Sequence, residues 1–127
     1  MPPAVPTDLA DLVTTSPVQL PSSYLAFLRE SNGGEGELGA QPGWFVLWPA
    51  GEVMRSNREY HVQEYLPGFL GIGSSGGGQL LAFDTRQGQP YPVTAVPFVP
   101  MEMTDALLVA ASFEEFLGLM GKTWEER

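Results

Sequence analysis

Two apolar runs separated by a cluster of glycine and serine occupy residues 69–84, with the sequence FLGIGSSGGGQLLAFD. We expect strands over residues 69–73 and 79–84, because both runs are apolar and are bounded by turn-forming residues. The short connection between them favours antiparallel pairing. A third strand is expected over residues 92–97, after a turn around residues 87–90. The centre of the chain therefore predicts an antiparallel sheet.

Residues 44–48, WFVLW, lie upstream of these strands and are apolar on both faces. They predict a buried strand, which Pro49 ends. Trp44 and Trp48 are accordingly expected to belong to the core rather than to a ligand-stacking site. Residues 35–43 are polar and rich in glycine, and they predict a loop.

Several segments outside the predicted strands have apolar residues at helical spacing. A first short helix, capped by Thr7, is predicted to end at Ser16 and Pro17. A second helix is predicted to begin after Pro21 and to stop at residues 32–34, NGG. Residues 50–64 suggest a further helix, which residues 65–68 would end. One row of this helix would contain Val53, Asn57, Tyr60 and Glu64.

The clearest local signal lies near the end of the chain. Ser112 and Glu115 fit a capping box, and Gly121 offers a stop. The apolar stripe between them consists of Phe113, Phe116, Leu117 and Met120. Such a stripe needs a sheet to cover it. Helices that flank a run of antiparallel strands predict an α+β fold with a central antiparallel sheet, in a single domain over residues 1–127 whose residues 1–6 form a loose end.

Composition narrows the classes of function. The chain has 127 residues, of which 15 are acidic and 6 basic, so its net charge is −9. Such a charge repels phosphate backbones and anionic lipids, so we expect no nucleic-acid and no membrane partner, whereas a basic protein would be attracted. The absence of cysteine excludes a disulfide scaffold and a cysteine nucleophile. Neither a signal peptide nor an apolar run of bilayer length is evident, and a cytoplasmic protein is expected.

The sequence motifs that could indicate a nucleotide-binding, metal or catalytic site are weak. Residues 71–76 match G-x-G-x-x-G, but that fingerprint needs a helix to begin there, and a strand is predicted instead. The connection is therefore interpreted as a hairpin. His61 is the only histidine, which leaves no usual ligand set for zinc. We expect no enzyme activity, no catalytic residue, no metal and no cofactor.

The acidic residues outside the closing helix suggest a docking surface. If the fold gathers them, they form a field suited to a basic partner. An exposed tyrosine could supply an aromatic anchor. The predicted partner-binding residues are Glu35, Glu37, Glu52, Glu59, Tyr60, Glu64 and Tyr65. The alternative, that these acids only keep the protein soluble, remains open.

Several segments together resemble a known family over about residues 20–120. These are residues 20–28 (LPSSYLAFL), 32–34, 65–70, 72–78 with the following Phe83 and Asp84, and 111–117, together with Glu52 and Asn57. In this order they resemble the SUKH superfamily in its Smi/Knr branch. The resemblance implies an α+β fold and supplies no catalytic residue. Where many members place an acidic or amide residue in the glycine hairpin, this chain has Ser74 and Ser75.

The resemblance also implies a binding role. Bacterial members of the family are immunity proteins that neutralise a cognate polymorphic or contact-dependent toxin, often a nuclease or deaminase. A fungal member regulates cell-wall synthesis through protein contacts. The favoured hypothesis is an immunity protein that occludes a basic toxin domain, as a monomer or weak dimer. The alternatives are a regulatory or scaffold domain that binds an endogenous protein, and a small-ligand binder.

Overall fold

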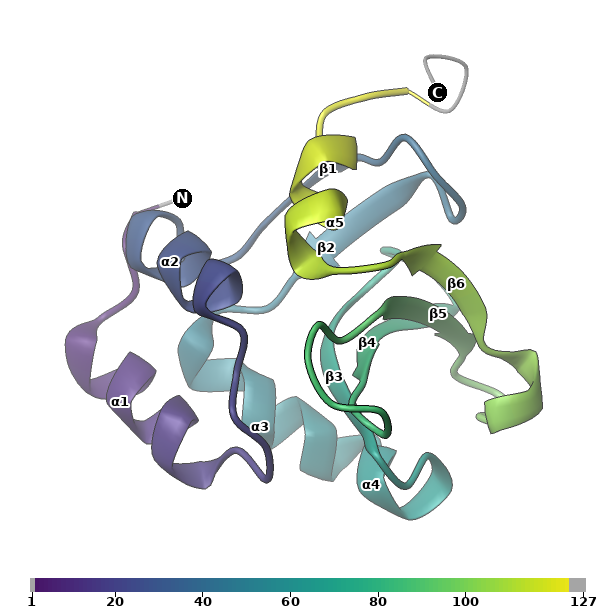
Figure 1. The fold of residues 1–127 in the computed structure, drawn as a ribbon, viewed down its shortest axis with the longest axis horizontal. Coiled ribbons are helices and arrows are strands. Elements are labelled where there is room, and N and C mark those ends of the chain that lie inside the picture. Colours follow the sequence, from purple (N-terminus) through teal and green to yellow (C-terminus); the bar gives the residue numbers. More distant parts are fainter. Residues whose placement is uncertain (1, 124–127) are drawn as a thin grey trace.

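Six strands form one antiparallel sheet in which each strand pairs with the next along the chain (Figure 1). The computed structural model describes residues 2–123. Their order across the sheet is β1-β2-β3-β4-β5-β6. The strands are β1 (Gly34–Glu37), β2 (Trp44–Leu47), β3 (Phe69–Ser74), β4 (Gln79–Asp84), β5 (Val93–Pro97) and β6 (Leu107–Ala110). The expected α+β fold with a central antiparallel sheet is confirmed.

Five α-helices and one 3-10 turn complete the part of the chain that the structure describes. They are α1 (Pro6–Thr15), α2 (Ser22–Glu30), α3 (Ala50–Glu59), α4 (Val62–Tyr65), η1 (Met103–Asp105) and α5 (Phe113–Leu119). No helix within residues 2–123 is long and apolar enough to cross a lipid bilayer.

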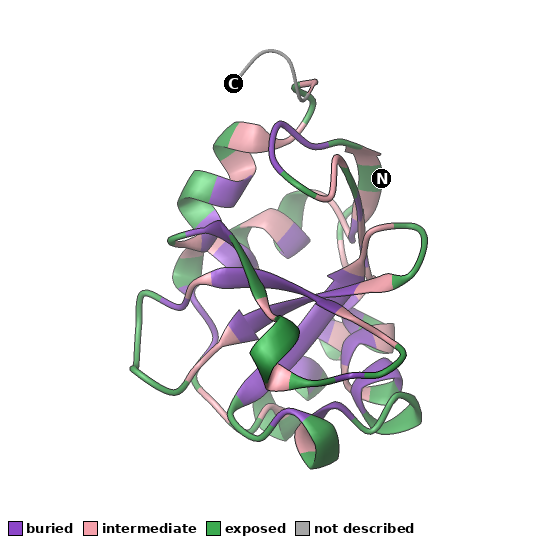
Figure 2. Ribbon diagram, turned by 90° about the vertical axis from the view of Figure 1, so that its right-hand side faces the viewer, coloured by how far each residue is buried: buried purple, intermediate pink, exposed green. Residues whose placement is uncertain are grey.

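Side chains of β3, β4 and β5 are buried on both faces of the sheet, and Figure 2 shows these central strands coloured as buried along most of their length. Because neighbouring side chains of a strand point to opposite faces, two separate cores result. Leu81 and Phe83 join the larger core with α1, α2, α3 and α5. Leu80 and Ala82 join the smaller core, which α4 and the segment after β5 cover.

The glycine cluster connects β3 to β4 as a hairpin, as the sequence predicts, and the pairing register shifts between Gly71 and Gly73. Gly73 pairs with Leu47 of β2. A Cβ atom at Gly73 would collide with the backbone of Val46 and Leu47. Glycine therefore lets β2 and β3 approach closely at this bulge.

Four aromatic side chains fill the larger core beneath α5. The ring centroid of Phe113 lies 5.1 Å from that of Tyr24 and 6.0 Å from that of Phe83. Phe116 lies 5.8 Å from Phe113 on the same helix. The Oγ of Ser112 accepts a hydrogen bond from the backbone N–H of Glu115 at 3.1 Å, which confirms the predicted N-terminal cap.

The predicted loop over residues 35–43 is wrong at its start, because β1 runs over residues 34–37 and pairs with β2. The alternating glycines and glutamates have low strand propensity, and the ladder offered by β2 overrides it. The sequence also missed β6 and η1. The prediction that Trp44 belongs to the core is wrong: it is 40% exposed at the start of β2, where that strand pairs with β1 but not with β3.

Two helix boundaries also differ from the prediction. Thr7 is not the cap of α1, since the helix begins at Pro6 after Val5. The helix predicted over residues 50–64 breaks at His61, whose φ of 56° lies in the left-handed region. This break separates α3 from α4. At the N-terminus, the backbone N–H of Ala4 donates to the carbonyl of Leu28 at 3.0 Å, and that of Asn32 donates to Pro2 at 2.8 Å.

The Tyr24 hydroxyl is fully buried and has no hydrogen-bond partner among residues 2–123. Burial raises the pKa of this hydroxyl far above its usual range. A buried polar group without a partner costs about 1–3 kcal/mol. Tyr24→Phe keeps the edge-on contacts with Phe83 and Phe113, so we expect it to raise the free energy of unfolding by about 1 kcal/mol, measured by urea denaturation.

Tyr91→Phe is the matched control for this prediction. The Tyr91 hydroxyl donates to the carbonyl of Gln19 at 2.9 Å. Its removal should lower the free energy of unfolding by about 0.5–1.5 kcal/mol. An equal loss in both variants would contradict the view that the Tyr24 hydroxyl is unsatisfied.

Candidate partner-binding site

Three aromatic side chains from separate segments contact one another in a row beside the smaller core. The Trp48 and Tyr60 rings lie 6.1 Å apart at an interplanar angle of 12°, and the Tyr60 and Phe98 rings lie 4.6 Å apart. Trp48 follows β2, Tyr60 ends α3 and Phe98 follows β5. The backbone N–H of Phe98 donates to Gly78 at 2.9 Å, so the glycine hairpin holds one end of this row.

Beside this row the surface forms a hollow of about 500 Å³. Its lining residues are Tyr60, Tyr65, Phe98, Val99, Pro100, Met101 and Glu102. Tyr60 is 45% exposed, Tyr65 is 55% exposed and Val99 is 90% exposed. Exposed apolar side chains gathered in one hollow, with polar residues around them, are typical of an interaction site.

The break at His61 positions both tyrosines of the hollow, because it turns the chain from α3 into α4. A buried amide network fixes this turn. Asn57 donates from Nδ2 to the carbonyl of Gly71 at 2.8 Å and accepts at Oδ1 from the Gly71 N–H at 2.8 Å. Gln63 donates to Asn57 Oδ1 and to the Phe69 carbonyl, each at 2.9 Å. The network therefore ties α3, the turn that begins α4, and β3 together.

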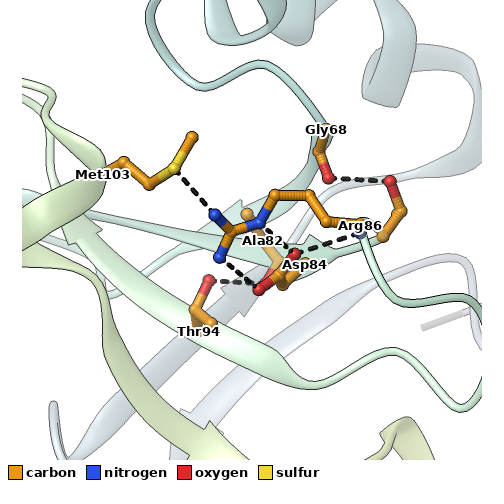
Figure 3. Close-up of polar contacts among 7 residues, drawn as sticks. Gly68, Ala82, Asp84, Arg86, Thr94 and Met103 are labelled. Atoms are coloured by element: carbon orange, nitrogen blue, oxygen red, sulfur yellow. Dashed lines mark hydrogen bonds and ion pairs between the residues drawn. The ribbon is translucent and has the colours of Figure 1, made fainter.

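The opposite wall of the hollow, residues 98–102, is held at its far end by Arg86 (Figure 3). The guanidinium of Arg86 donates to the sulfur of Met103 at 2.9 Å and lies 5.0 Å from the centroid of the Phe69 ring. It also donates to both carboxylate oxygens of Asp84, at 2.9 and 2.8 Å. Arg86 thus links the turn after β4 to the segment that walls the hollow.

The ion pair between Asp84 and Arg86 gives a pH dependence to stability. The hydrogen bond from Arg86 holds the pKa of the Asp84 carboxyl below its usual range. A carboxyl whose folded-state pKa is depressed stabilises the fold above the unfolded-state pKa and loses that effect as the pH falls through the folded-state value.

For Asp84→Asn we therefore expect a small loss of stability that is fully present above about pH 5 and that disappears at lower pH. Urea denaturation of both proteins between pH 2.5 and 7 (about the range in which an aspartate titrates) measures it. A difference that stays constant over this range would contradict the ion-pair origin of the effect.

The structure places the predicted partner-binding residues in two regions. Glu59 and Glu64 are exposed and adjoin the two tyrosines of the hollow. Glu52 lies on the same side of α3 about two turns earlier and pairs with Arg55 at 3.3 Å. Glu35 and Glu37 lie on β1, and Figure 1 shows β1 and α4 at opposite ends of the molecule. These seven residues therefore do not form one continuous face.

Sequence reasoning did not include the wall of residues 98–102 among the site residues. The only local signal there is that Pro97 and Pro100 bracket two apolar residues, which takes Phe98 and Val99 out of the sheet. Tertiary structure alone brings this wall to Tyr60 and Tyr65. No group of three or more histidine, aspartate or glutamate side chains within residues 2–123 could hold a metal ion.

Comparison with known proteins places this fold in a family. No curated protein matches the chain. The family model described as SMI1 / KNR4 family (SUKH-1) matches residues 3–119, which include every element from α1 to α5. The match covers most of the chain, and the chain therefore belongs to the SMI1 / KNR4 (SUKH-1) family.

Proposed function

We propose that this chain is an immunity protein that neutralises a cognate bacterial toxin by binding and covering it. The contact would be made by the acidic aromatic surface, which we define as the residues of the hollow together with its two flanking glutamates. Its members are Glu59, Tyr60, Glu64, Tyr65, Phe98, Val99, Pro100, Met101 and Glu102. Membership of the SUKH-1 family supports a role of this kind.

The observation that carries the proposal is the exposure of apolar side chains inside an acidic setting. Val99 is 90% exposed to solvent, and Tyr65 is 55% exposed. Burial of such groups at the centre of an interface supplies much of the affinity of a complex, while surrounding charges set the rate and specificity of association. A surface of this composition fits a partner that is basic around an apolar contact.

The net charge of −9 narrows the class of partner. A toxin that acts on nucleic acid must itself attract phosphates, so its substrate groove is expected to be basic. An acidic protein is drawn to the same groove and can exclude the substrate without any chemistry of its own. This charge is compatible with a nuclease or deaminase toxin, the kind of target that the family resemblance implies, and neutralisation by occlusion requires no catalytic residue.

Co-expression tests this proposal. Toxin domains encoded in the same genome would be induced in a host cell with and without this chain. We expect one of these toxins to stop growth when it is expressed alone. When this chain is co-expressed, the cells should grow, and the two proteins should purify as a stable complex. Failure to rescue from every such toxin, together with recovery of an endogenous non-toxin partner, would instead support the regulatory or scaffold role.

Charge reversal then locates the contact. Glu59→Lys combined with Glu64→Lys changes the acidic aromatic surface, and Glu35→Lys combined with Glu37→Lys makes the same change of net charge on β1. We expect the first pair to slow association with the toxin roughly tenfold at low salt, and the β1 pair to slow it much less. Equal slowing by both pairs would show that only overall charge matters, and a larger effect on β1 would place the contact there.

A further inference from the structure

We infer that the hollow of the acidic aromatic surface is a receptor for a single arginine side chain of the partner. The identity of the partner as a toxin rests on the proposed function, but the preference of the hollow for arginine follows from its own side chains. Three features support it: exposed aromatic rings, an exposed valine on the opposite wall, and a carboxylate on that wall.

The aromatic rings provide a platform for a planar cation. The Tyr60 ring lies 4.6 Å from that of Phe98 at a tilt of 32° and stacks on that of Trp48 at 6.1 Å, so these contacts fix its position. Tyr60 keeps 45% of its surface exposed, and Tyr65, which lines the same hollow, keeps 55%. A guanidinium group stacks on such a ring through its flat face, and an ammonium group cannot reproduce that contact as well. Val99, which is 90% exposed on the opposite wall, suits the aliphatic stem of the same side chain.

Glu102 supplies the opposite charge. It lines the hollow together with six uncharged residues, and none of the seven lining residues is a lysine or arginine. Arg86 is tied to Met103, the residue after Glu102, but its guanidinium is paired with both carboxylate oxygens of Asp84. The Glu102 carboxylate is exposed and forms no ion pair within residues 2–123. A planar two-oxygen acceptor matches the fork of donors on arginine.

Other occupants fit less well. A phosphate or carboxylate group would meet Glu102, with Glu59 and Glu64 nearby, and would be repelled. A leucine side chain would fill the apolar part of the hollow but would desolvate Glu102 without compensation. A lysine side chain would satisfy the charge but would lose the stacking. Arginine is the one side chain that uses all three features at once.

Peptide titration of the full-length, isotope-labelled protein tests this inference without any toxin. The probe is a capped five-residue glycine–serine peptide with arginine at its centre. The matched control carries citrulline, which has the same shape and no charge, and further peptides carry lysine or leucine. We expect saturable NMR shifts for the arginine peptide, confined to the signals of Tyr60, Tyr65, Val99 and Met101. Binding of the other three peptides should be at least about fivefold weaker.

Two variants check the source of the preference. Glu102→Gln should weaken binding of the arginine peptide and leave binding of the citrulline peptide unchanged. Glu37→Gln makes an equal charge change on β1 and should alter the binding of neither peptide. Tyr60→Leu should reduce the preference for arginine over lysine. Equal binding of arginine and citrulline or leucine peptides, shifts elsewhere on the surface, or no saturable shift at all would each overturn the inference.

The two proposals fail separately. If the arginine peptide binds at the hollow but no toxin is neutralised, the arginine receptor is supported and the immunity role is contradicted. If a toxin is neutralised and the peptide does not bind, the immunity role stands and the arginine receptor falls.

Discussion

Phe113→Ala is expected to lower the free energy of unfolding by about 3–5 kcal/mol, the range measured for phenylalanine truncation in protein cores. The Phe113 side chain is 2% exposed and contacts the rings of Tyr24, Phe27, Phe83 and Phe116, with centroid separations of 5.1 to 6.0 Å. Its loss opens a cavity where α2, β4 and α5 meet, and these elements cannot all close in on it. Because a domain of this size is stable by only about 5–15 kcal/mol, urea denaturation will show a large fall in the midpoint.

Leu108→Ala is the control for this change. Leu108 is a large apolar residue as well, but its side chain is 63% exposed on the edge strand β6. We expect its truncation to change the free energy of unfolding by no more than about 0.5 kcal/mol. Similar losses in the two variants would contradict the assignment of the aromatic cluster as the centre of the core.

Asn57→Ala is expected to cost about 2–4 kcal/mol, because it removes a fully buried amide that bridges three segments. The variant leaves the N–H and the carbonyl of Gly71 without their partner on α3, and it takes the Oδ1 acceptor away from Gln63. Thermal and urea denaturation measure the loss. Since the network fixes the turn at His61, the NMR signals of Tyr60 and Tyr65 should also shift in the variant.

Asn57→Asp separates the hydrogen-bond account from simple loss of volume. It keeps the acceptor that faces the Gly71 N–H but points a second carboxylate oxygen at the carbonyls of Gly71 and Val53. Burial raises the pKa of a carboxyl group, so the folded state favours the protonated form and the loss of stability should shrink as the pH falls. Gln63→Ala, at a half-buried position, should cost less than Asn57→Ala. A pH-independent loss in the aspartate variant would contradict this role.

The sequence predicted the elements whose signals are local. The strands β3, β4 and β5 were found because their apolar runs are bounded by turn residues. The cap at Ser112 was found because a capping box needs only four neighbouring residues. Two of the features that the sequence missed, β1 and the helix break at His61, are stabilised by other segments: β2 pairs with β1, and β3 holds Asn57 beside the break.

The residues of the candidate site also fall into two groups, those that the sequence predicted and those that only the tertiary structure brought together. The sequence alone established an acidic protein with a family pattern, and it predicted Glu59, Tyr60, Glu64 and Tyr65 as neighbours in a site, because these residues are close together in the chain. Only the tertiary structure placed Glu35 and Glu37 on the edge strand β1, away from α4, and brought Phe98, Val99 and Glu102 to the two tyrosines. The physical reason is that charge and helical spacing are properties of short segments. A hollow, in contrast, is formed by side chains from distant segments, whose positions depend on strand pairing and core packing.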